Sequence, residues 1–283
     1  MAVSKKYREN KDHPFGEIHQ IAKLMNMSDE GVRIYAGKGL VYPEVKKNSR
    51  IRSFDVMDFT MLLYSRVYQK SGFTLKEVEK LVNESSLDEI HTKYHKKMTD
   101  VDEEIERLQR AKACLEEVSA SIDQIPELLN NCKITEFPGL YRIEFMNQGD
   151  MWNNDSEMID LISEWTNYGP CTRISSRYSI SLILEGKQPT EAMSGLGLLP
   201  EYAERFGVSP TERIIYVPPC DRAVHTIFAA DNTQLIPDMS GLNRFIQDNH
   251  LTPTQDAVTL GFVNLNFNTT FTRYFHLWIP LEI

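Results

Sequence analysis

At 283 residues, with 41% hydrophobic residues and a net charge of −9, the chain suits two domains that each have a sizeable core. No apolar run approaches the roughly 20 residues needed to span a bilayer, and the polar N-terminus lacks the apolar core of a signal peptide. A membrane-spanning protein is therefore excluded, and we expect a cytoplasmic protein without a membrane partner.

The charge is divided unevenly along the chain. Residues 1–80 contain 15 Lys and Arg against 10 Asp and Glu, whereas the remaining residues contain 16 against 30. This asymmetry predicts a small basic module joined to a larger acidic one, and a basic module is suited to nucleic acid.

The four cysteines are widely spaced and include no Cys-x-x-Cys pair. Structural zinc and iron–sulfur sites need closer ligands as a rule, so we expect reduced thiols, no metal and no cofactor. The cysteines are Cys114, Cys132, Cys171 and Cys220.

The first predicted structural element is a helix-turn-helix, preceded by a flexible basic tail over residues 1–14. Apolar residues recur at helical spacing from Gly16 to Leu24, and Ser28 can cap a second helix that carries Arg33 and Tyr35. Gly37 and Gly39 can end that helix. Residues 25–27 form the connection between the two helices.

A basic hairpin is predicted at residues 44–54, with a turn at Asn48-Ser49. Directly after a helix-turn-helix, such a hairpin, or wing, is placed to contact phosphates, although a solvated surface loop would have the same composition. Its cations are Lys46, Lys47, Arg50 and Arg52. Further helix starts carry capping signals at Asp55, Thr74 and Ser86.

A long helix is predicted for residues 86–126, because the chain has no glycine or proline between Ser86 and Pro126. Its apolar positions form a heptad pattern with one stutter and one stammer. We expect an antiparallel coiled coil with a second copy, and packing on the chain's own C-terminal domain is the alternative. The positions are Leu87, Ile90, Tyr94, Met98, Val101, Ile105, Leu108, Ala111, Leu115, Val118, Ile122 and Ile125.

Residues 130–283 have an α+β pattern, so the whole chain is predicted to be multidomain, α followed by α+β. Helices are expected around Trp165 and Phe245, with a short one around Tyr202. The order strand, helix, strand occurs twice, which predicts an internal repeat. The predicted strands span 134–146, 173–185, 213–230 around a turn at Pro218-Pro219, 256–268 and 272–283.

Residues 15–84 resemble the winged helix-turn-helix DNA-binding domain of the MerR family of transcriptional regulators. The family's Arg-x-Tyr, Gly-Leu and Pro signature is present as Arg33, Ile34, Tyr35, Gly39, Leu40 and Pro43. Its later Gly-Phe-Ser/Thr-Leu-x-Glu-Ile/Val signal is present as Gly72, Phe73, Thr74, Leu75, Glu77 and Val78. The family's wing usually has Tyr-Arg-x-Tyr, and of these residues only Arg52 carries over.

Residues 130–283 resemble the GyrI-like effector-binding domains of multidrug-sensing MerR regulators, through the repeated order and the closing Leu277-Trp278-Ile279-Pro280-Leu281. Drug-sensing relatives have a buried Glu on the strand before the last one, whereas residues 261–268 contain no acid. Asparagine only forms hydrogen bonds, so we expect a neutral or polar effector rather than a lipophilic cation.

The candidate DNA-binding residues are led by Arg33, whose guanidinium can reach a base edge or a phosphate from a recognition helix. Tyr35 either contacts a phosphate or packs in the domain. The full set is Lys23, Ser28, Arg33, Tyr35, Lys46, Lys47, Arg50 and Arg52.

The candidate effector-binding residues combine an apolar face with a polar group. They are Trp152, Tyr178, Tyr216, Asn264, Asn266 and Trp278. Metal sensing through Cys114 is a minor alternative, because the next cysteine, Cys132, is far along the chain.

The resemblance implies a homodimer on a palindromic promoter element, which activates transcription by distorting DNA when a small aromatic or amphipathic effector binds, and which acts on RNA polymerase indirectly. We expect a regulator rather than an enzyme. Two alternatives stay open: a repressor, or a C-terminal small-molecule hydrolase that uses His225, His276 or Cys220.

Overall fold

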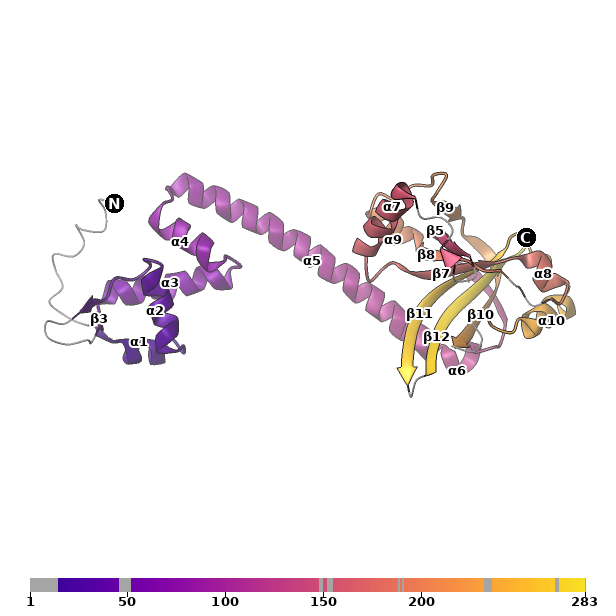
Figure 1. Ribbon diagram of the computed structural model, residues 1–283, viewed down its shortest axis with the longest axis horizontal. Coiled ribbons are helices and arrows are strands. Elements are labelled where there is room, and N and C mark those ends of the chain that lie inside the picture. The colour runs from indigo at the N-terminus through magenta and orange to yellow at the C-terminus, as the bar shows by residue number, and fades with distance from the viewer. Residues whose placement is uncertain are drawn as a thin grey trace. The chain divides into compact units, whose positions relative to one another are not determined.

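The computed structural model describes residues 15–45, 52–147, 150–151, 155–187, 189, 191–231, 236–267 and 270–282. The chain divides into two compact units, residues 1–105 and 106–283, and the long helix α5 (Leu87–Asp123) contributes to both (Figure 1). In the part of the chain that is described, no helix combines the length and the apolar character needed to cross a bilayer.

The N-terminal unit has the predicted winged helix-turn-helix architecture. Helices α1 (Ile18–Leu24) and α2 (Asp29–Gly37) are followed by α3 (Val56–Lys70) and α4 (Leu75–Asn83). Strands β1 (Gly16–Glu17), β2 (Glu44–Val45) and β3 (Arg52–Phe54) form an antiparallel sheet in the order β1-β3-β2. The predicted turn of the wing lies outside the described residues.

Capping residues start these helices where the sequence places them. The Ser28 hydroxyl accepts the Gly31 amide at 3.0 Å, Asp55 caps α3, and Thr74 and Glu77 form a capping box on α4. Gly39, with φ of +65°, adopts the left-handed conformation that ends α2, whereas Gly37 remains helical.

The apolar positions of α5 lie on two different faces after Leu108. Cys114 is buried and Ala111 and Val118 are half-buried in the C-terminal unit. A second row stays 44–66% exposed and consists of Met98, Val101, Ile105, Leu108, Leu115 and Ile122. The single broken heptad of the sequence therefore corresponds to two apolar faces, one covered by the chain itself and one open; we call the open row the exposed seam.

Helix α6 (Ile125–Leu128) leads into the C-terminal sheet, in which the described strands are all antiparallel neighbours. The strands are β4 (Lys133–Phe137), β5 (Leu140–Asn147), β6 (Asp150–Met151), β7 (Arg173–Tyr178), β8 (Met193–Leu198), β9 (Ile215–Val217), β10 (Cys220–Asp231), β11 (Ala257–Phe267) and β12 (Thr270–Pro280). Helices α7 (Ser156–Asn167), α8 (Ile180–Leu184), α9 (Pro200–Arg205) and α10 (Ser240–Asp248) connect them.

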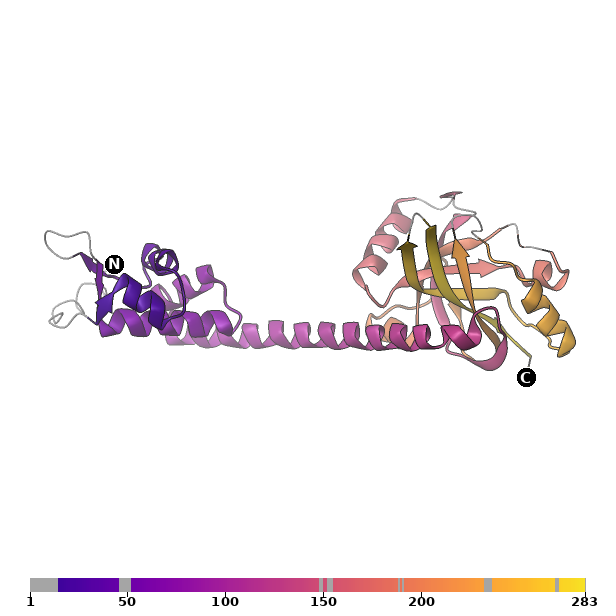
Figure 2. The ribbon, with the colours of Figure 1, turned by 90° about the horizontal axis from the view of Figure 1, so that it is seen from below.

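The sheet confirms the internal repeat and extends it by one strand. Its order is β4-β10-β12-β11-β7-β8-β5-β6, with β9 beside β5. Each half is strand, helix, strand, strand: β5-α7-β7-β8 and β10-α10-β11-β12. In each half, the third strand lies between the first and the second and pairs with both. Strands β7 and β11 pair at the centre of the sheet and join the two halves. Figure 2 shows the curved strands of the second half.

Two strand predictions were wrong in detail. Residues 134–146 form two strands separated by a turn at Gly139, and the predicted strand 173–185 ends at Tyr178, where α8 follows. Residues 213–230 form β9 and β10 on either side of the predicted turn at Pro218-Pro219. Strand β8 was missed because its sequence, Met-Ser-Gly-Leu-Gly-Leu, looks like a loop. A Cβ on Gly195 would lie 1.9 Å from the Ile143 carbonyl oxygen, so this glycine is required by the close approach of β5.

Candidate DNA-binding surface and ligand cavity

Helix α2 is held on the N-terminal unit by its buried residues Val32 and Tyr35. The Tyr35 hydroxyl donates to Gln69 of α3, and burial raises the pKa of this tyrosine. The Arg66 guanidinium donates to the Met25 carbonyl in the turn before α2. Of the two roles left open for Tyr35, the structure shows the packing role, and Arg66 is an anchor that the sequence did not identify.

Arg33 lies on the exposed face of α2, with 48% of its side chain accessible. Its Nη1 donates to the Glu30 carboxylate at 3.0 Å, one turn earlier on the helix. An exposed ion pair of this kind contributes only about 0–1 kcal/mol, so Arg33 can exchange Glu30 for a phosphate or a base edge at little cost. The Glu30 contact could have been predicted from the i, i+3 spacing.

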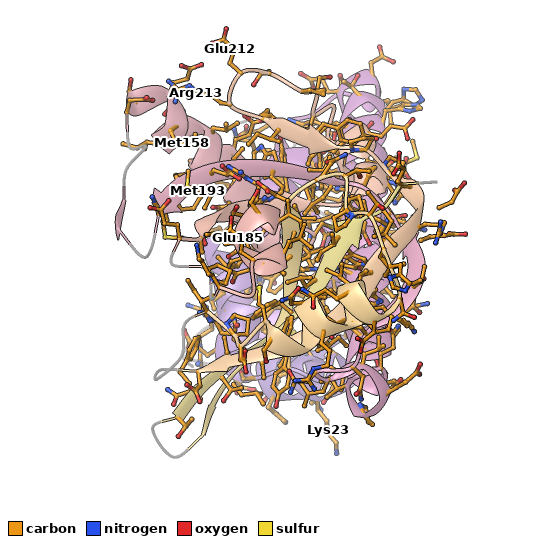
Figure 3. The ribbon with its side chains drawn as sticks, turned by 90° about the vertical axis from the view of Figure 1, so that its right-hand side faces the viewer. Lys23, Met158, Glu185, Met193, Glu212 and Arg213 are labelled. Atoms are coloured by element: carbon orange, nitrogen blue, oxygen red, sulfur yellow. The ribbon has the colours of Figure 1, made fainter. Side chains whose placement is uncertain are left out.

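The other predicted DNA-binding residues fall into three groups. Lys23, in the last turn of α1, and Arg52, in β3, are exposed, and Figure 3 shows the Lys23 side chain extending outward. Ser28 is occupied as the N-cap of α2. Lys46, Lys47 and Arg50 lie outside the described residues.

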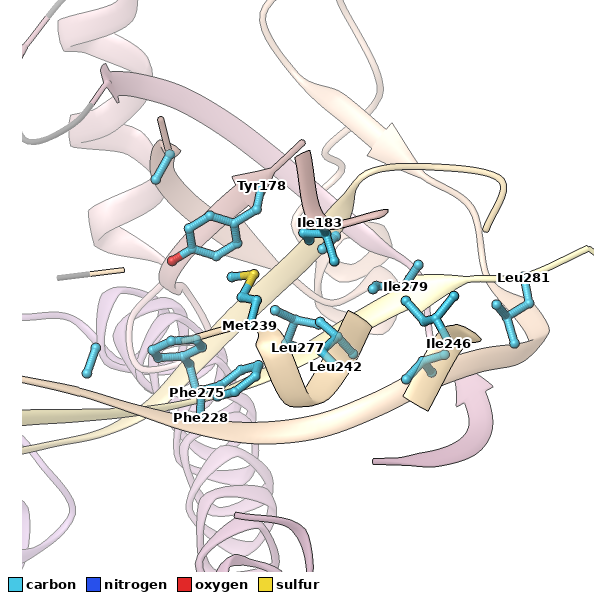
Figure 4. Close-up of a cluster of buried hydrophobic side chains, with 14 residues drawn as sticks. Tyr178, Ile183, Phe228, Met239, Leu242, Ile246, Phe275, Leu277, Ile279 and Leu281 are labelled. Atoms are coloured by element: carbon cyan, nitrogen blue, oxygen red, sulfur yellow. The ribbon is translucent and has the colours of Figure 1, made fainter. Parts of the chain in front are cut away.

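A cavity of about 450 Å³ opens in the C-terminal unit where the two halves of the sheet meet. Its walls are mostly apolar and aromatic, and Tyr178 and Phe275 of the adjoining core (Figure 4) belong to them. The lining residues are Met146, Ile174, Ser176, Tyr178, Ala192, Ser194, Ile236, Thr259, Gly261, Asn264, Phe271, Arg273, Tyr274 and Phe275.

The polar lining residues include Asn264 and Arg273, the tyrosines Tyr178 and Tyr274, and a group of three hydroxyl side chains. The Ser176 and Ser194 hydroxyls are 2.8 Å apart across β7 and β8. The Thr259 hydroxyl accepts the Ser176 amide at 2.8 Å and donates to its carbonyl at 3.2 Å. No carboxylate, histidine or thiol is among the described lining residues. The cavity is thus built to hold an apolar body and to hydrogen-bond a few polar groups.

Of the predicted effector-binding residues that the structure describes, two line the cavity: Tyr178, which is 3% exposed, and Asn264. Tyr216 instead packs against Tyr141 in a tilted arrangement, with ring centroids 4.4 Å apart, and Asn266 is exposed further along β11. Trp278 is buried against Phe137 and does not belong to the lining. Trp152 lies outside the described residues.

Alternation along the strands explains the outcome for Trp278. Its neighbours Leu277 and Ile279 point into the core beside the cavity, and Trp278 therefore points to the opposite face of β12. The sequence predicted the strand but not which of its faces borders the cavity.

A buried carboxylate exists in this unit, but on β5 rather than β11. Glu144 is 7% exposed and accepts two hydrogen bonds from Arg177, at 2.9 and 3.0 Å. Its Oε1 is also 3.3 Å from Nη1 of Arg142, which is fully buried, and Arg177 reaches Asp256 at 2.8 Å. Burial lowers the pKa of Arg142 to about 10. Glu144 therefore belongs to a structural ion-pair network, and it is not among the described residues that line the cavity.

The two histidines considered for catalysis lie together in the sheet, away from the described cavity lining. The His225 Nε2 and His276 Nδ1 atoms are 2.9 Å apart, and both rings stack on Trp278. Burial lowers the pKa of His225 to about 4 and that of His276 to about 3, so both are neutral at pH 7.

A separate ion-pair cluster lies on the surface of this unit. There Arg213, labelled in Figure 3, contacts Asp155 and Glu157 at the start of α7.

The comparisons with known proteins concern mainly the N-terminal part. Residues 17–85 match the family described as MerR HTH family regulatory protein. The HTH-type transcriptional regulator CueR of Escherichia coli O6:H1 is 26% identical over 115 residues, which are 41% of this chain and 82% of that protein.

Two solved structures extend the comparison to the C-terminal part. The cryo-EM structure of an EcmrR–DNA complex is 16% identical, with a TM-score of 0.35, and covers 94% of this chain and 99% of that one. A hydrolase from Listeria innocua is 6% identical, with a TM-score of 0.31, and covers 58% of this chain and 98% of that one.

Proposed function

We propose that the chain is a homodimeric transcriptional regulator of the MerR family, whose model residues 17–85 match, and that its C-terminal domain binds a small effector molecule. The observation that carries this proposal is the combination of an exposed arginine on α2 with a separate, mostly apolar cavity of about 450 Å³. One surface is suited to DNA and the other to a small molecule.

The DNA contact is assigned to α2 and the wing. Arg33 reads a base edge or a phosphate in the major groove, and Arg52 and Lys23 add exposed positive charge on the same domain. Lys46, Lys47 and Arg50 complete the proposed phosphate contacts. Tyr35 and Ser28 act indirectly, since they fix the position of α2 through packing and capping.

The dimer is assigned to the exposed seam of α5. Its six apolar side chains are 44–66% exposed along the helix, and a second copy of α5 would bury them in an antiparallel coiled coil. The dimer has two-fold symmetry, so its DNA site is expected to be a palindrome.

The effector is expected to be a neutral, amphipathic, aromatic molecule. The aromatic walls favour a flat apolar body, and Ser176, Ser194 and Thr259 offer hydrogen bonds. The described lining contains Arg273 but no carboxylate, so no negative charge among these residues would offset the desolvation of a cation. Binding shifts the dimer toward the state that distorts the promoter and so acts on RNA polymerase indirectly, which requires different affinities for the two states.

Footprinting of the purified full chain on the DNA upstream of its own gene tests the regulatory proposal. We expect two protected half-sites related by two-fold symmetry. Protection without such symmetry would contradict the dimeric arrangement, and no protection at any sequence would contradict the proposed function.

The effector proposal is tested by thermal shift of the full chain with neutral aromatic molecules, matched lipophilic cations and matched anions. A ligand that binds the folded state raises the midpoint as its occupancy increases. Neutral compounds should raise the midpoint most. A response confined to cations would contradict the proposed effector class.

A further inference from the structure

Two buried thiols meet where the second part of α5 packs on the C-terminal domain. Cys114 of α5 is 1% exposed, and Cys171, between α7 and β7, is 2% exposed. Their Sγ atoms are 2.7 Å apart. A disulfide has an S–S distance of about 2.05 Å, so bond formation needs a movement of less than about 1 Å.

We propose that Cys114 and Cys171 form a reversible disulfide that fastens α5 to the C-terminal domain under oxidising conditions. Two S–H bonds break and one S–S bond forms, and the two electrons and two protons pass to a hydroperoxide. With hydrogen peroxide, the O–O bond breaks and two water molecules are released. In a reducing compartment such a bond is transient, as in thiol-based sensing.

The two thiols connect elements with different roles in the proposed regulator. Cys114 directly precedes Leu115 and follows Leu108 of the exposed seam by six residues, but it lies on a different, buried face of α5. Cys171 belongs to the core that contains Trp165 of α7. A covalent bond between them would hold the dimerisation helix to the domain that carries the cavity, in addition to the ion pair between Glu117 of α5 and Arg173 of β7.

The surroundings of the pair set the rate of its oxidation. Burial, followed by the adjacent Cys114, raises the pKa of Cys171 to about 12, while Arg173 and Arg110 act in the opposite direction. Tyr202 of α9 and Glu117 of α5 complete the ionisable groups around the pair. Because the thiolate is the nucleophile, oxidation is slow at neutral pH and becomes faster as the pH rises. At neutral pH the disulfide therefore forms only when the protein is exposed to the oxidant for a long time.

The other cysteines provide internal controls. Cys132 and Cys220 are half-buried, and the Cys220 thiol lies 3.2 Å from the Arg222 carbonyl oxygen. No described contact brings either of them to a second thiol.

Thiol counting on the full chain tests the proposal. After exposure to hydrogen peroxide at about pH 8.5, the unfolded protein should have two reactive thiols instead of the four in the sequence, and a reductant should restore all four. Peptide mapping should recover a Cys114–Cys171 cross-link, which Cys220→Ser retains and Cys114→Ala abolishes. Four remaining thiols, or a cross-link through Cys132 or Cys220, would overturn the proposal.

Hydrogen exchange of the wild-type chain tests the fastening separately and needs no variant. Amides of α5 around residues 110–121 should exchange more slowly in the oxidised form than in the reduced form. Equal exchange in a sample that contains the cross-link would show that the bond does not hold the helix, and would overturn that part.

Discussion

Among single residues, Arg33 offers the most direct test of DNA binding. It is exposed and its described partner, Glu30, is on the same helix, so Arg33→Ala should leave the fold intact. We expect its loss to weaken operator binding by about 1–3 kcal/mol, or roughly 5- to 150-fold, if it contacts a base. Fluorescence anisotropy with the footprinted DNA measures this change.

Arg205→Ala is the matched control for Arg33→Ala, because it removes an exposed arginine from α9 of the other unit. It should leave affinity within about two-fold of the wild type, since it removes one surface charge away from the proposed contact. Equal losses of operator affinity in the two variants would mean that Arg33 of α2 has no specific role in DNA binding. A smaller slope of affinity against salt for Arg33→Ala alone would identify a phosphate contact.

The buried histidine pair makes the stability of the C-terminal domain dependent on pH. His225 and His276 have pKa values of about 4 and about 3 in the folded protein, against 6.5 in an unfolded chain. The unfolded chain therefore binds more protons below pH 6.5, and stability falls as the pH falls from about 6.5 to about 4. Each histidine contributes up to about 1.4 kcal/mol per pH unit.

Urea unfolding at pH 7, 6 and 5, followed by tryptophan fluorescence, measures this slope. All three tryptophans lie after residue 150, so the signal reports the C-terminal domain. His276→Gln should reduce the slope by up to about 1.4 kcal/mol per pH unit, with the largest effect between pH 6 and 5. His250→Asn, at an exposed position with φ of +52° that Asn tolerates, should leave it unchanged. An unchanged slope in His276→Gln would show that the pair does not titrate on unfolding.

At the scale of elements, α5 packs on the C-terminal unit with one face, and the exposed seam, which is the proposed dimer interface, can be tested alone. Leu108 is 52% exposed, so Leu108→Glu should not disturb its own chain. In a symmetric dimer each substitution counts twice, and we expect the dimer dissociation constant to rise by about 100-fold or more. Sedimentation equilibrium measures this constant.

Glu103→Lys is the control for the seam, because this residue lies on α5 between seam positions Val101 and Ile105 and is exposed. It should remain a dimer at concentrations where Leu108→Glu is a monomer. A dimeric Leu108→Glu would place the dimer interface elsewhere in the chain and would contradict the coiled-coil assignment.

At the scale of the whole molecule, the cavity and the DNA-binding domain should respond independently to mutation. Ala192 is 8% exposed and lines the cavity, so Ala192→Phe should fill part of it. We expect effector-induced thermal shift to be lost while DNA binding without effector stays within about two-fold of the wild type.

Gln247→Phe adds an aromatic ring on the exposed face of α10 and should retain the thermal shift. If Ala192→Phe also retained a full shift, the effector would bind outside the cavity. If it lost DNA binding as well, the two activities would not be separable, and a general loss of folding would be visible in the tryptophan signal.

The sequence by itself determined the features that depend on local chemistry. Helix starts at Ser28, Asp55 and Thr74 follow from caps that satisfy backbone amides within one turn, and the exposure of Arg33 follows from helical periodicity. The MerR-type domain was predicted from its resemblance to the family's motifs, and the uninterrupted α5 from the lack of glycine and proline between Ser86 and Pro126. The internal repeat was visible because strand-like and helix-like patterns of apolar residues occur in the same order in each half of the C-terminal domain.

Only the tertiary structure decided which faces become sites. Tyr178 and Asn264 border the cavity while Trp278 turns away, because a strand's alternation does not say which of its faces will be covered. Glu144 became part of an arginine network through pairing of β5, β7 and β8, and Cys114 came to lie against Cys171, 57 positions later. Such contacts join residues far apart in the chain, and packing rather than local preference selects them.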